Sequence, residues 1–154
     1  MEAPGSDGEL QYSSMLTMQK PVTILIADDN QRMRESLQII LSAVEEFKVL
    51  GEACDGKEAI QMIEMHHPDI LLIDINMAPM NGFEAARQIR KKFPSVKIIA
   101  LSLHQEPVYC RNMLAAGARG YVTKSSPYVY IVEAIRTVAD GGSYIDKALQ
   151  GKLK

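Results

Sequence analysis

The sequence predicts an α/β fold, in which a doubly wound parallel sheet of five strands is covered by helices on both faces. Short runs of apolar, β-branched residues alternate five times with longer segments whose apolar residues recur at helical spacing. The short runs are apolar almost without a break, which is typical of parallel strands buried on both faces. Right-handed crossovers between such strands place helices on both sides of the sheet.

The size and composition suit one such domain. The chain has 154 residues, of which 47% are hydrophobic and 23% charged, close to the average for globular proteins. No apolar run approaches the ~18 residues that a membrane-spanning helix needs. A net charge of -2 leaves no basic excess for binding nucleic acid through its phosphates. Cys54 and Cys110 are too few for a disulfide scaffold, so we expect small core residues in a cytoplasmic protein.

The first strand and helix follow a polar leader. Residues 1–20 lack a sustained period and are predicted to be a flexible leader or a remnant of cloning, with Met15 and Met18 as alternative starts. Val22–Ala27 is too short for a helix and suits a buried strand. Asn30 precedes a helical pattern and is placed to cap it. The apolar positions of that helix are Met33, Leu37, Ile40, Leu41 and Val44.

Four more strands and four more helices complete the predicted domain. The strands are predicted at residues 47–53, 70–73, 96–101 and 119–122. The helices are marked by Ala59, Ile60 and Ile63, by Phe83, Ala86, Ile89 and Phe93, by Val108, Met113 and Leu114, and by Ile131, Ala134, Ile135 and Val138. Their stop signals are Pro68, Pro94, Gly117 and Gly141-Gly142. The domain is therefore predicted over residues 21–142, and residues 143–154 are predicted to begin a linker or tail.

Polar residues stand where four of the predicted strands end. Asp28 and Asp29 follow the first strand, Asp74 the third and Ser102 the fourth, and Lys124 comes shortly after the fifth. Any one of them alone reads best as a solvated turn residue. Because ligands bind beyond the carboxyl ends of the strands in open α/β sheets, five such positions together predict a site.

These residue types point to phosphoryl chemistry. Three neighbouring carboxylates would repel one another and raise each other's pKa. A divalent cation relieves this repulsion, and an all-oxygen site open to water suits Mg²⁺ or Mn²⁺. Lys124 adds a second positive charge. A carboxylate, a hard cation, an ammonium and a hydroxyl are the groups needed to hold a phosphoryl group.

The motifs resemble those of a known family. They are Ile-Ala-Asp-Asp-Asn at 26–30, Asp-Ile-Asn-Met at 74–77, Leu-Ser-Leu-His at 101–104 and Gly-Ala-Arg-Gly-Tyr-Val-Thr-Lys at 117–124. In order and spacing they resemble the receiver domain of bacterial two-component response regulators, over about residues 20–142. The segments 114–122 and 134–142 are similar to the NarL/FixJ (LuxR-type) subfamily. This resemblance implies a flavodoxin-like (CheY-like) sheet with strand order 2-1-3-4-5.

The resemblance also implies a role for each residue of the site. Asp74 would accept a phosphoryl group from a histidine kinase, and Lys124 would pair with a phosphoryl oxygen. Mg²⁺ would be held by Asp28, Asp29 and Asp74, together with the backbone carbonyl of Asn76.

A switch is implied next to this site. The Ser102 hydroxyl would move onto the phosphoryl group, and Tyr121 would swing inward behind it. This movement would couple the site to the face made by the fourth helix and fifth strand. His104, at the start of that helix, is expected at the surface.

Three positions depart from the family pattern. Ala78 replaces a common proline, with Pro79 one place later, which predicts a different loop path over the site. Leu103 is larger than the usual alanine and is predicted to narrow access for water. Ser125 replaces the proline that often follows the lysine. Because a cis bond before a non-proline residue costs ~3 kcal/mol, we expect a trans Lys124–Ser125 bond.

The predicted function is that of a signalling switch whose only chemistry is Mg²⁺-dependent phosphorylation and dephosphorylation of its own aspartate. Members of the subfamily usually carry a helix-turn-helix DNA-binding domain after the receiver. DNA binding would then reside beyond residue 154, and a histidine kinase and a second copy of the chain would be the partners, with no membrane contact. The alternative is a stand-alone receiver that binds a partner protein when phosphorylated.

Two enzyme or cofactor classes fit less well. A metal-dependent phosphatase with an aspartate nucleophile usually carries Asp-x-Asp after the first strand, whereas Asp74 follows the third and Asn76 replaces the second acid. A dinucleotide-binding domain needs a glycine-rich loop after the first strand, and Asp28 and Asp29 stand there instead.

Overall fold

The computed structural model describes residues 20–153. The leader predicted over residues 1–20, with Met15 and Met18, therefore lies outside the described residues except for Lys20. The strands are β1 Val22–Ala27, β2 Phe47–Ala53, β3 Ile70–Ile73, β4 Lys97–Ser102, β5 Gly120–Thr123 and β6 Tyr144–Ile145. The helices are α2 Gln31–Ser42, α3 Gly56–His66, α4 Gly82–Lys92, α5 Pro107–Ala116, α6 Tyr128–Ala139 and α7 Lys147–Gln150.

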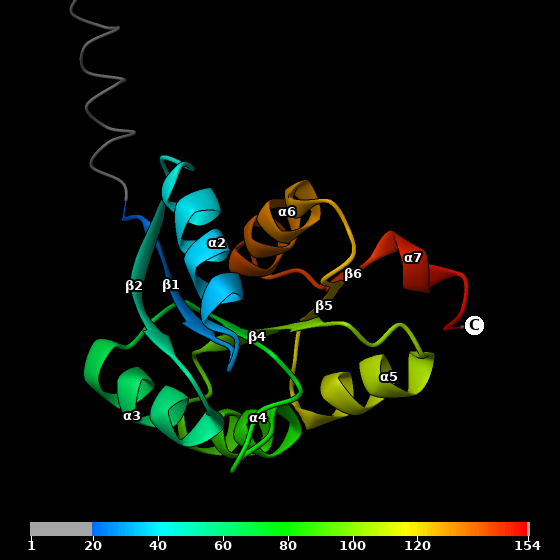
Figure 1. The fold of residues 1–154 in the computed structure, drawn as a ribbon, viewed down its shortest axis with the longest axis horizontal. Coiled ribbons are helices and arrows are strands. Elements are labelled where there is room, and N and C mark those ends of the chain that lie inside the picture. Colours follow the sequence, from blue (N-terminus) through cyan, green and yellow to red (C-terminus); the bar gives the residue numbers. More distant parts are fainter. Residues whose placement is uncertain (1–19, 154) are drawn as a thin grey trace, which may run out of the picture.

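The strands form one parallel sheet in the order β2-β1-β3-β4-β5-β6. Helices α2 and α6 cover one face, and α3, α4 and α5 cover the other (Figure 1). The doubly wound fold and the order 2-1-3-4-5 are thereby confirmed, with one strand added at the β5 edge. None of the helices between residues 20 and 153 is long and apolar enough to span a bilayer.

Each central strand supplies side chains to two separate cores. Leu71 and Ile73 of β3 pack under α3, α4 and α5, while Ile70 and Leu72 pack under α2 and α6. Successive side chains of a strand point to opposite faces, so a strand covered on both faces must be apolar throughout. This is why the unbroken apolar runs in the sequence could be recognised as strands.

The sixth strand and the helix after it were not predicted. Tyr144 and Ile145 pair in parallel with Gly120 and Tyr121 of β5, and Leu149 of α7 is fully buried against the core under α5. Residues 144–150 are thus packed on the sheet, in a segment that was predicted as linker or tail. A strand of two half-buried residues is too short to show a period, which is why the sequence pattern missed it.

Smaller differences concern single residues. Cys110 is buried as predicted, but Cys54 is exposed, because it follows Ala53, whose side chain faces the core, and so points outward. Val108 is 52% exposed rather than buried in its helix face. The Lys124–Ser125 bond is trans as expected, and the cis bond among the described residues is Ala78–Pro79.

Candidate functional site

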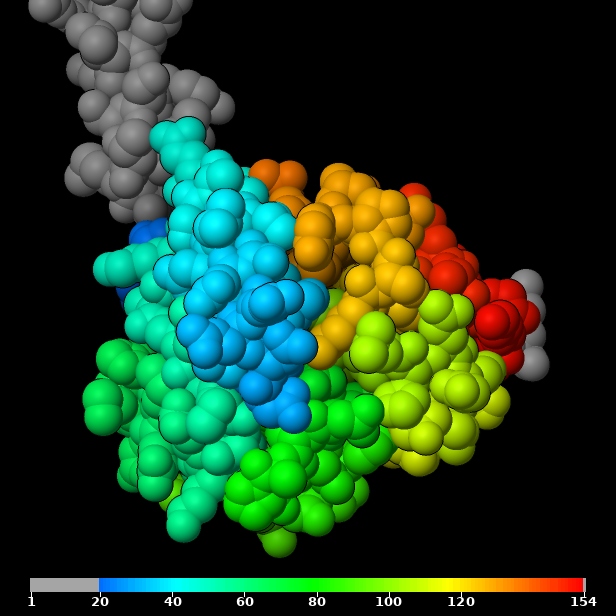
Figure 2. All heavy atoms as spheres, viewed as in Figure 1, coloured from blue at the N-terminus to red at the C-terminus, as the bar shows by residue number. Residues whose placement is uncertain are grey.

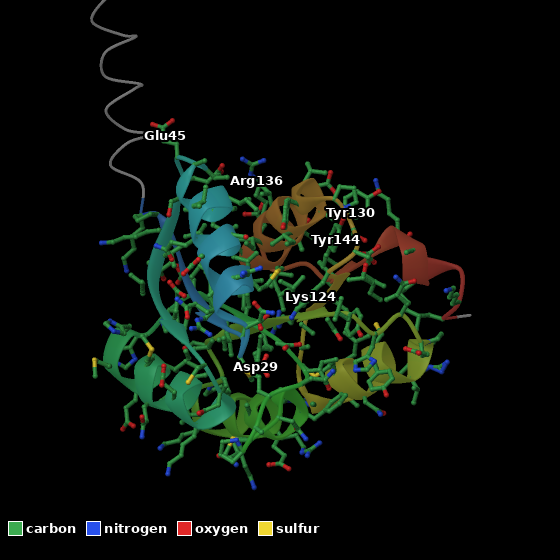
Figure 3. All side chains as sticks on the ribbon, viewed as in Figure 1. Asp29, Glu45, Lys124, Tyr130, Arg136 and Tyr144 are labelled. Carbon is green, nitrogen blue, oxygen red and sulfur yellow. The ribbon has the colours of Figure 1, made fainter. Side chains whose placement is uncertain are left out.

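The five polar residues predicted to meet do lie at one edge of the sheet. Asp28 and Asp29 follow β1, Asp74 follows β3, Ser102 ends β4 and Lys124 follows β5. The blue start of α2, the green segment before α4 and the yellow-green segment before α5 lie next to one another on the face in view (Figure 2). Asp29 and Lys124 mark the same edge from β1 and β5 (Figure 3).

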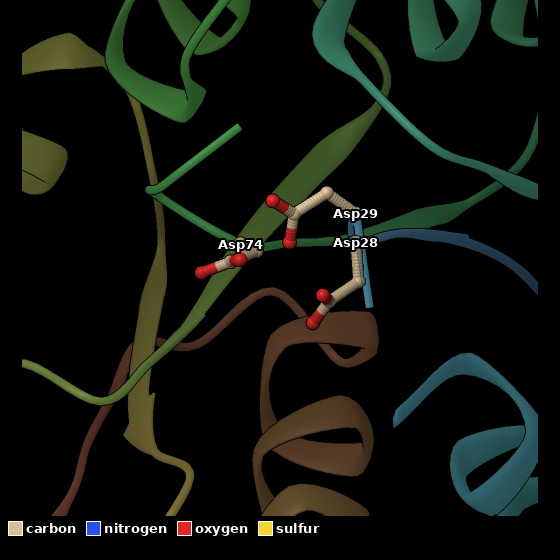
Figure 4. A group of neighbouring side chains, drawn as sticks. All are labelled: Asp28, Asp29 and Asp74. Carbon is tan, nitrogen blue, oxygen red and sulfur yellow. The ribbon is translucent and has the colours of Figure 1, made fainter. Parts of the chain in front are cut away.

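The three aspartates form a compact cluster of carboxylates. One oxygen from each of Asp28, Asp29 and Asp74 lies within 4.8 Å of the other two. Figure 4 shows the three side chains gathered together. Asp28 and Asp74 are buried, whereas Asp29 is exposed, so the cluster opens to solvent on one side.

Lys124 lies between two members of this cluster. Its Nζ is 2.7 Å from Asp28 Oδ2 and 3.4 Å from Asp74 Oδ2. Only 12% of the lysine side chain is exposed, so solvent screens these charges weakly. The ammonium thus pairs closely with Asp28 and leaves Asp74 more loosely held.

The sheet itself places these side chains. Each residue directly beyond a strand continues the ladder of the neighbouring strand through its backbone N–H. Asp28 donates to the Ala53 carbonyl at 3.0 Å, and Asp74 donates to Ala27 at 2.9 Å. Lys124 donates to the Ser102 carbonyl at 2.7 Å. The backbones of the site are therefore as fixed as the strands that carry them.

The carboxyl group of Asp74 has a raised pKa. Burial is the main cause that raises the pKa of Asp74 from 3.8 to about 6. The Lys124 ammonium opposes this shift and the negative charge of Asp28 adds to it. Mutual repulsion was predicted to raise the pKa, but the loss of water around Asp74 contributes more.

The donor set fits a hard divalent cation. Asp28 Oδ2 is fully buried and has no hydrogen bond of regular geometry among the described residues, although Lys124 Nζ lies 2.7 Å away. Three carboxylates with a single lysine leave an excess of negative charge, and all the available ligand atoms are oxygens. Asn76 lies in the adjoining loop, where its backbone N–H donates to Asp74 Oδ1 at 3.3 Å. The role of its carbonyl as a metal ligand remains a prediction.

The two predicted switch residues, Ser102 and Tyr121, both form hydrogen bonds with the backbone of His104. The buried Ser102 Oγ accepts a hydrogen bond from the His104 N–H at 3.0 Å. The Tyr121 hydroxyl donates to the carbonyl of the same His104 at 2.8 Å. The Tyr121 ring is fully buried, and this burial raises its pKa to about 12. In this structure Tyr121 is therefore in the inward position.

His104 is more involved in the site than the sequence indicated. Its ring stacks on Tyr109 with ring centroids 3.8 Å apart, and its Nε2 lies 2.8 Å from Asn76 Nδ2. It is half-buried rather than a plain surface residue. No periodicity could have shown this, because the contact joins the segments after β3 and β4, which only the sheet brings together.

Comparison with known proteins identifies the family of the chain. The sequence pattern of the response regulator receiver domain matches residues 24–136. The transcriptional regulatory protein DegU of Brevibacillus brevis is 40% identical over 124 residues, which make up 80% of this chain and 52% of that protein. The oxygen regulatory protein NreC of Staphylococcus epidermidis is 38% identical over 131 residues, 84% of this chain and 60% of its own length.

A solved structure has the same fold. It is a LuxR-family two-component response regulator from Aurantimonas sp. SI85-9A1, with a TM-score of 0.84 and 28% identity, covering 86% of this chain and 95% of that one. The chain belongs to the response regulator receiver family, in its NarL/FixJ (LuxR-type) branch. It spans 52% of the length of DegU and 60% of the length of NreC.

Proposed function

We propose that this chain is a phosphoacceptor receiver domain, in which Asp74 takes a phosphoryl group from a histidine kinase with Mg²⁺ as cofactor. The observation that carries the proposal is the setting of Asp74. Its carboxylate lies at the end of a central strand, within the cluster of Asp28 and Asp29, and 3.4 Å from the ammonium of Lys124.

The geometry favours Asp74 over Asp28 as the nucleophile. Asp28 is engaged on both oxygens, because Oδ1 accepts from the Asn30 N–H at 2.9 Å and Oδ2 lies 2.7 Å from Lys124. The contacts of Asp74 are longer: the Asn76 N–H donates to its Oδ1 at 3.3 Å, and Lys124 Nζ lies 3.4 Å from its Oδ2. Of these two buried carboxylates, Asp74 is therefore the one with more freedom to form a new bond.

In the proposed transfer, an oxygen of Asp74 attacks the phosphorus atom. The new O–P bond forms while the bond from phosphorus to the donor atom breaks, and the leaving group departs with that electron pair. The transition state spreads negative charge over three oxygens, so positioning and positive charge supply most of the catalysis. Lys124 is placed to bind one of these oxygens. Asp28, Asp29, Asp74 and the Asn76 carbonyl would hold Mg²⁺, which would supply further positive charge to the phosphoryl group.

The switch proposal follows from the contacts of Ser102. An acyl phosphate brings new negative charge and acceptor oxygens to Asp74. The Ser102 hydroxyl, which now accepts from the His104 N–H, can turn to donate to a phosphoryl oxygen. Because Tyr121 donates to the same residue, its position would respond to this change.

The output is proposed to be transcription regulation through a DNA-binding part beyond Lys154. DegU is named as a transcriptional regulatory protein, and the chain covers only part of such relatives. The alternative is a stand-alone receiver that binds a partner protein when phosphorylated. The reading frame of the parent gene decides between them: a helix-turn-helix region after residue 154 supports transcription, and a stop codon there supports the alternative.

Phosphorylation is tested with a small donor. The protein is incubated with Mg²⁺ and acetyl phosphate, and its intact mass is measured. We expect a gain of one phosphoryl group in the wild type and none in Asp74→Ala. The matched control, Asp140→Ala, removes an exposed acid outside the site and should keep the gain. A wild-type protein that takes up no phosphoryl group from any donor would overturn the proposal.

A further inference from the structure

Lys124 is carried by a tight turn whose two ends are bound by one carboxylate. The Ser126 N–H donates to the Thr123 carbonyl at 3.1 Å, which closes the turn around Lys124 and Ser125. Asp146 Oδ2 accepts from the Thr123 N–H at 3.0 Å and from Ser126 Oγ at 2.6 Å. The turn that presents the lysine is thus fastened at both ends from outside.

Asp146 is buried and is satisfied by hydrogen bonds alone. The residue has 0% exposure, and its other oxygen accepts from the Ala148 N–H at 2.9 Å. No lysine, arginine or histidine pairs with it between residues 20 and 153. A buried carboxylate without a cation is costly unless hydrogen-bond donors surround it, as they do here. Removing this side chain would leave the Thr123 N–H without a hydrogen-bond partner, which also costs free energy.

Strand β6 holds Asp146 against β5. The Asp146 N–H donates to the Tyr121 carbonyl at 2.8 Å, and the Tyr144 N–H donates to the Arg119 carbonyl at 3.0 Å. The Tyr144 hydroxyl also donates to the Glu133 carboxylate of α6 at 3.0 Å, and Leu149 of α7 is fully buried. The Asp146 side chain therefore continues the β5–β6 ladder by one step, at the level of the Lys124 turn.

We propose that Asp146 is a positioning residue for phosphoryl transfer, which holds Lys124 in place from the segment that follows the receiver core. The backbone of Lys124 is bound on one side by the Ser102 carbonyl, at 2.7 Å, and the turn is bound on the other side by Asp146. Residues 144–150 lie outside the range 24–136 that matches the family pattern. The inference rests on the proposed function, because it concerns the rate of that reaction.

The test separates the position of Lys124 from metal binding. The metal ligands come from β1 and β3, so a loosened Lys124 turn should slow the transfer and leave Mg²⁺ affinity unchanged. In Asp146→Ala we expect the phosphorylation rate at saturating acetyl phosphate to fall about tenfold, because small misplacements of a catalytic group have large effects on rate. Mg²⁺ affinity, measured by titration calorimetry, should stay within about twofold. Asp146→Asn keeps one acceptor oxygen and should be intermediate.

Val138→Ala controls for lost stability. Val138 is fully buried in the core under α2 and α6, and its apolar side chain forms no hydrogen bond with Asp146 or the Lys124 turn, so this variant loses stability but keeps every hydrogen bond of the turn. It should be phosphorylated at the wild-type rate well below its unfolding temperature. If Asp146→Ala does not fold, Asp146→Asn carries the test.

The outcomes keep this inference apart from the proposed function. A wild type that is never phosphorylated ends both. If the wild type is phosphorylated, and Asp146→Ala and Asp146→Asn are phosphorylated as fast as the wild type, only the role of Asp146 is overturned. The role of Asp146 is also overturned if Val138→Ala shows the same loss of rate. It is overturned as well if the loss of rate in the Asp146 variants comes with an equal loss of Mg²⁺ affinity.

Discussion

At the scale of single residues, the site holds more negative charge than its surroundings favour. Asp74 is buried beside Asp28, and Lys124 is the one cation that pairs with either of them among residues 20–153. Burial raises the pKa of Asp74 to about 6, so its ionised form is less favoured in the folded protein than in the unfolded chain. The folded protein therefore loses stability at the place where a cation and a phosphoryl group are proposed to bind.

The first prediction follows from this pKa. The folded protein binds the Asp74 proton more tightly than the unfolded chain does. The free energy of unfolding should therefore fall as pH rises from about 4 to about 6. Asp74→Asn removes this dependence and should stabilise the metal-free protein at pH 7 by about 1–2 kcal/mol, allowing for the opposing charge of Lys124. Chemical denaturation in EDTA at pH 4 and pH 7 measures both effects. A variant less stable than the wild type at pH 7 would contradict the assignment.

At the scale of elements, helix starts are built from polar residues next to the site. Asn30, Asp55 and Asn81 each accept a hydrogen bond at the start of a helix, from Met33, Glu58 and Glu84 respectively. Asn30 was recognised as a cap from the sequence, because capping is a local interaction.

The second prediction concerns the start of α4. A Cβ atom at Gly82 would lie 2.5 Å from the Asp74 carbonyl oxygen and 2.8 Å from Ile75 Cα. Gly82→Ala must therefore push α4 away from the backbone of Asp74. We expect a loss of about 1–3 kcal/mol in the free energy of unfolding, measured with denaturant, and weaker Mg²⁺ binding. Gly151→Ala, where the added Cβ meets nothing within 4 Å, is the control. Equal stability of the two variants would show that the close approach is relieved at no cost.

At the scale of the whole molecule, the carboxylates that would bind a cation join two strands of the sheet, and Lys124 links them to a third. The Asp28, Asp29 and Asp74 oxygens approach within 4.8 Å although they come from β1 and β3, and Lys124 adds β5. The unfolded chain does not hold these groups together, so cation binding should favour the folded state.

The third prediction is a stabilisation by Mg²⁺. At a concentration 100 times the dissociation constant, bound Mg²⁺ should add about 2.7 kcal/mol to the free energy of unfolding. The melting temperature should rise with Mg²⁺ in the wild type and in Asp140→Asn, which alters an acid outside the site. It should rise much less in Asp29→Asn, whose exposed carboxylate can be removed without disturbing the core. Parallel melting curves for Asp29→Asn and the wild type would exclude Asp29 as a ligand.

Much of the fold could be predicted because its signals are local. The run Ile70–Ile73 is apolar on both faces and Val22–Ala27 nearly so, and these two strands and Phe47–Ala53 have the bounds that the pattern predicted. Strand β6 was missed because its pairing with β5, rather than its own two residues, makes it a strand. Cys54 was misplaced because residue type alone does not say which way a side chain points at the end of a strand.

By itself, the sequence determined where the strands end and which polar residues stand at those ends, because burial and chain reversal act on neighbouring residues. Only the tertiary structure decided which of them are partners. The pairing of Lys124 with Asp28, the contact of His104 with Asn76, and the hold of Asp146 on the Lys124 turn all depend on the sheet order. The physical reason is that hydrogen bonds and ion pairs act over a few ångströms, and the strand pairings bring these distant segments within that range.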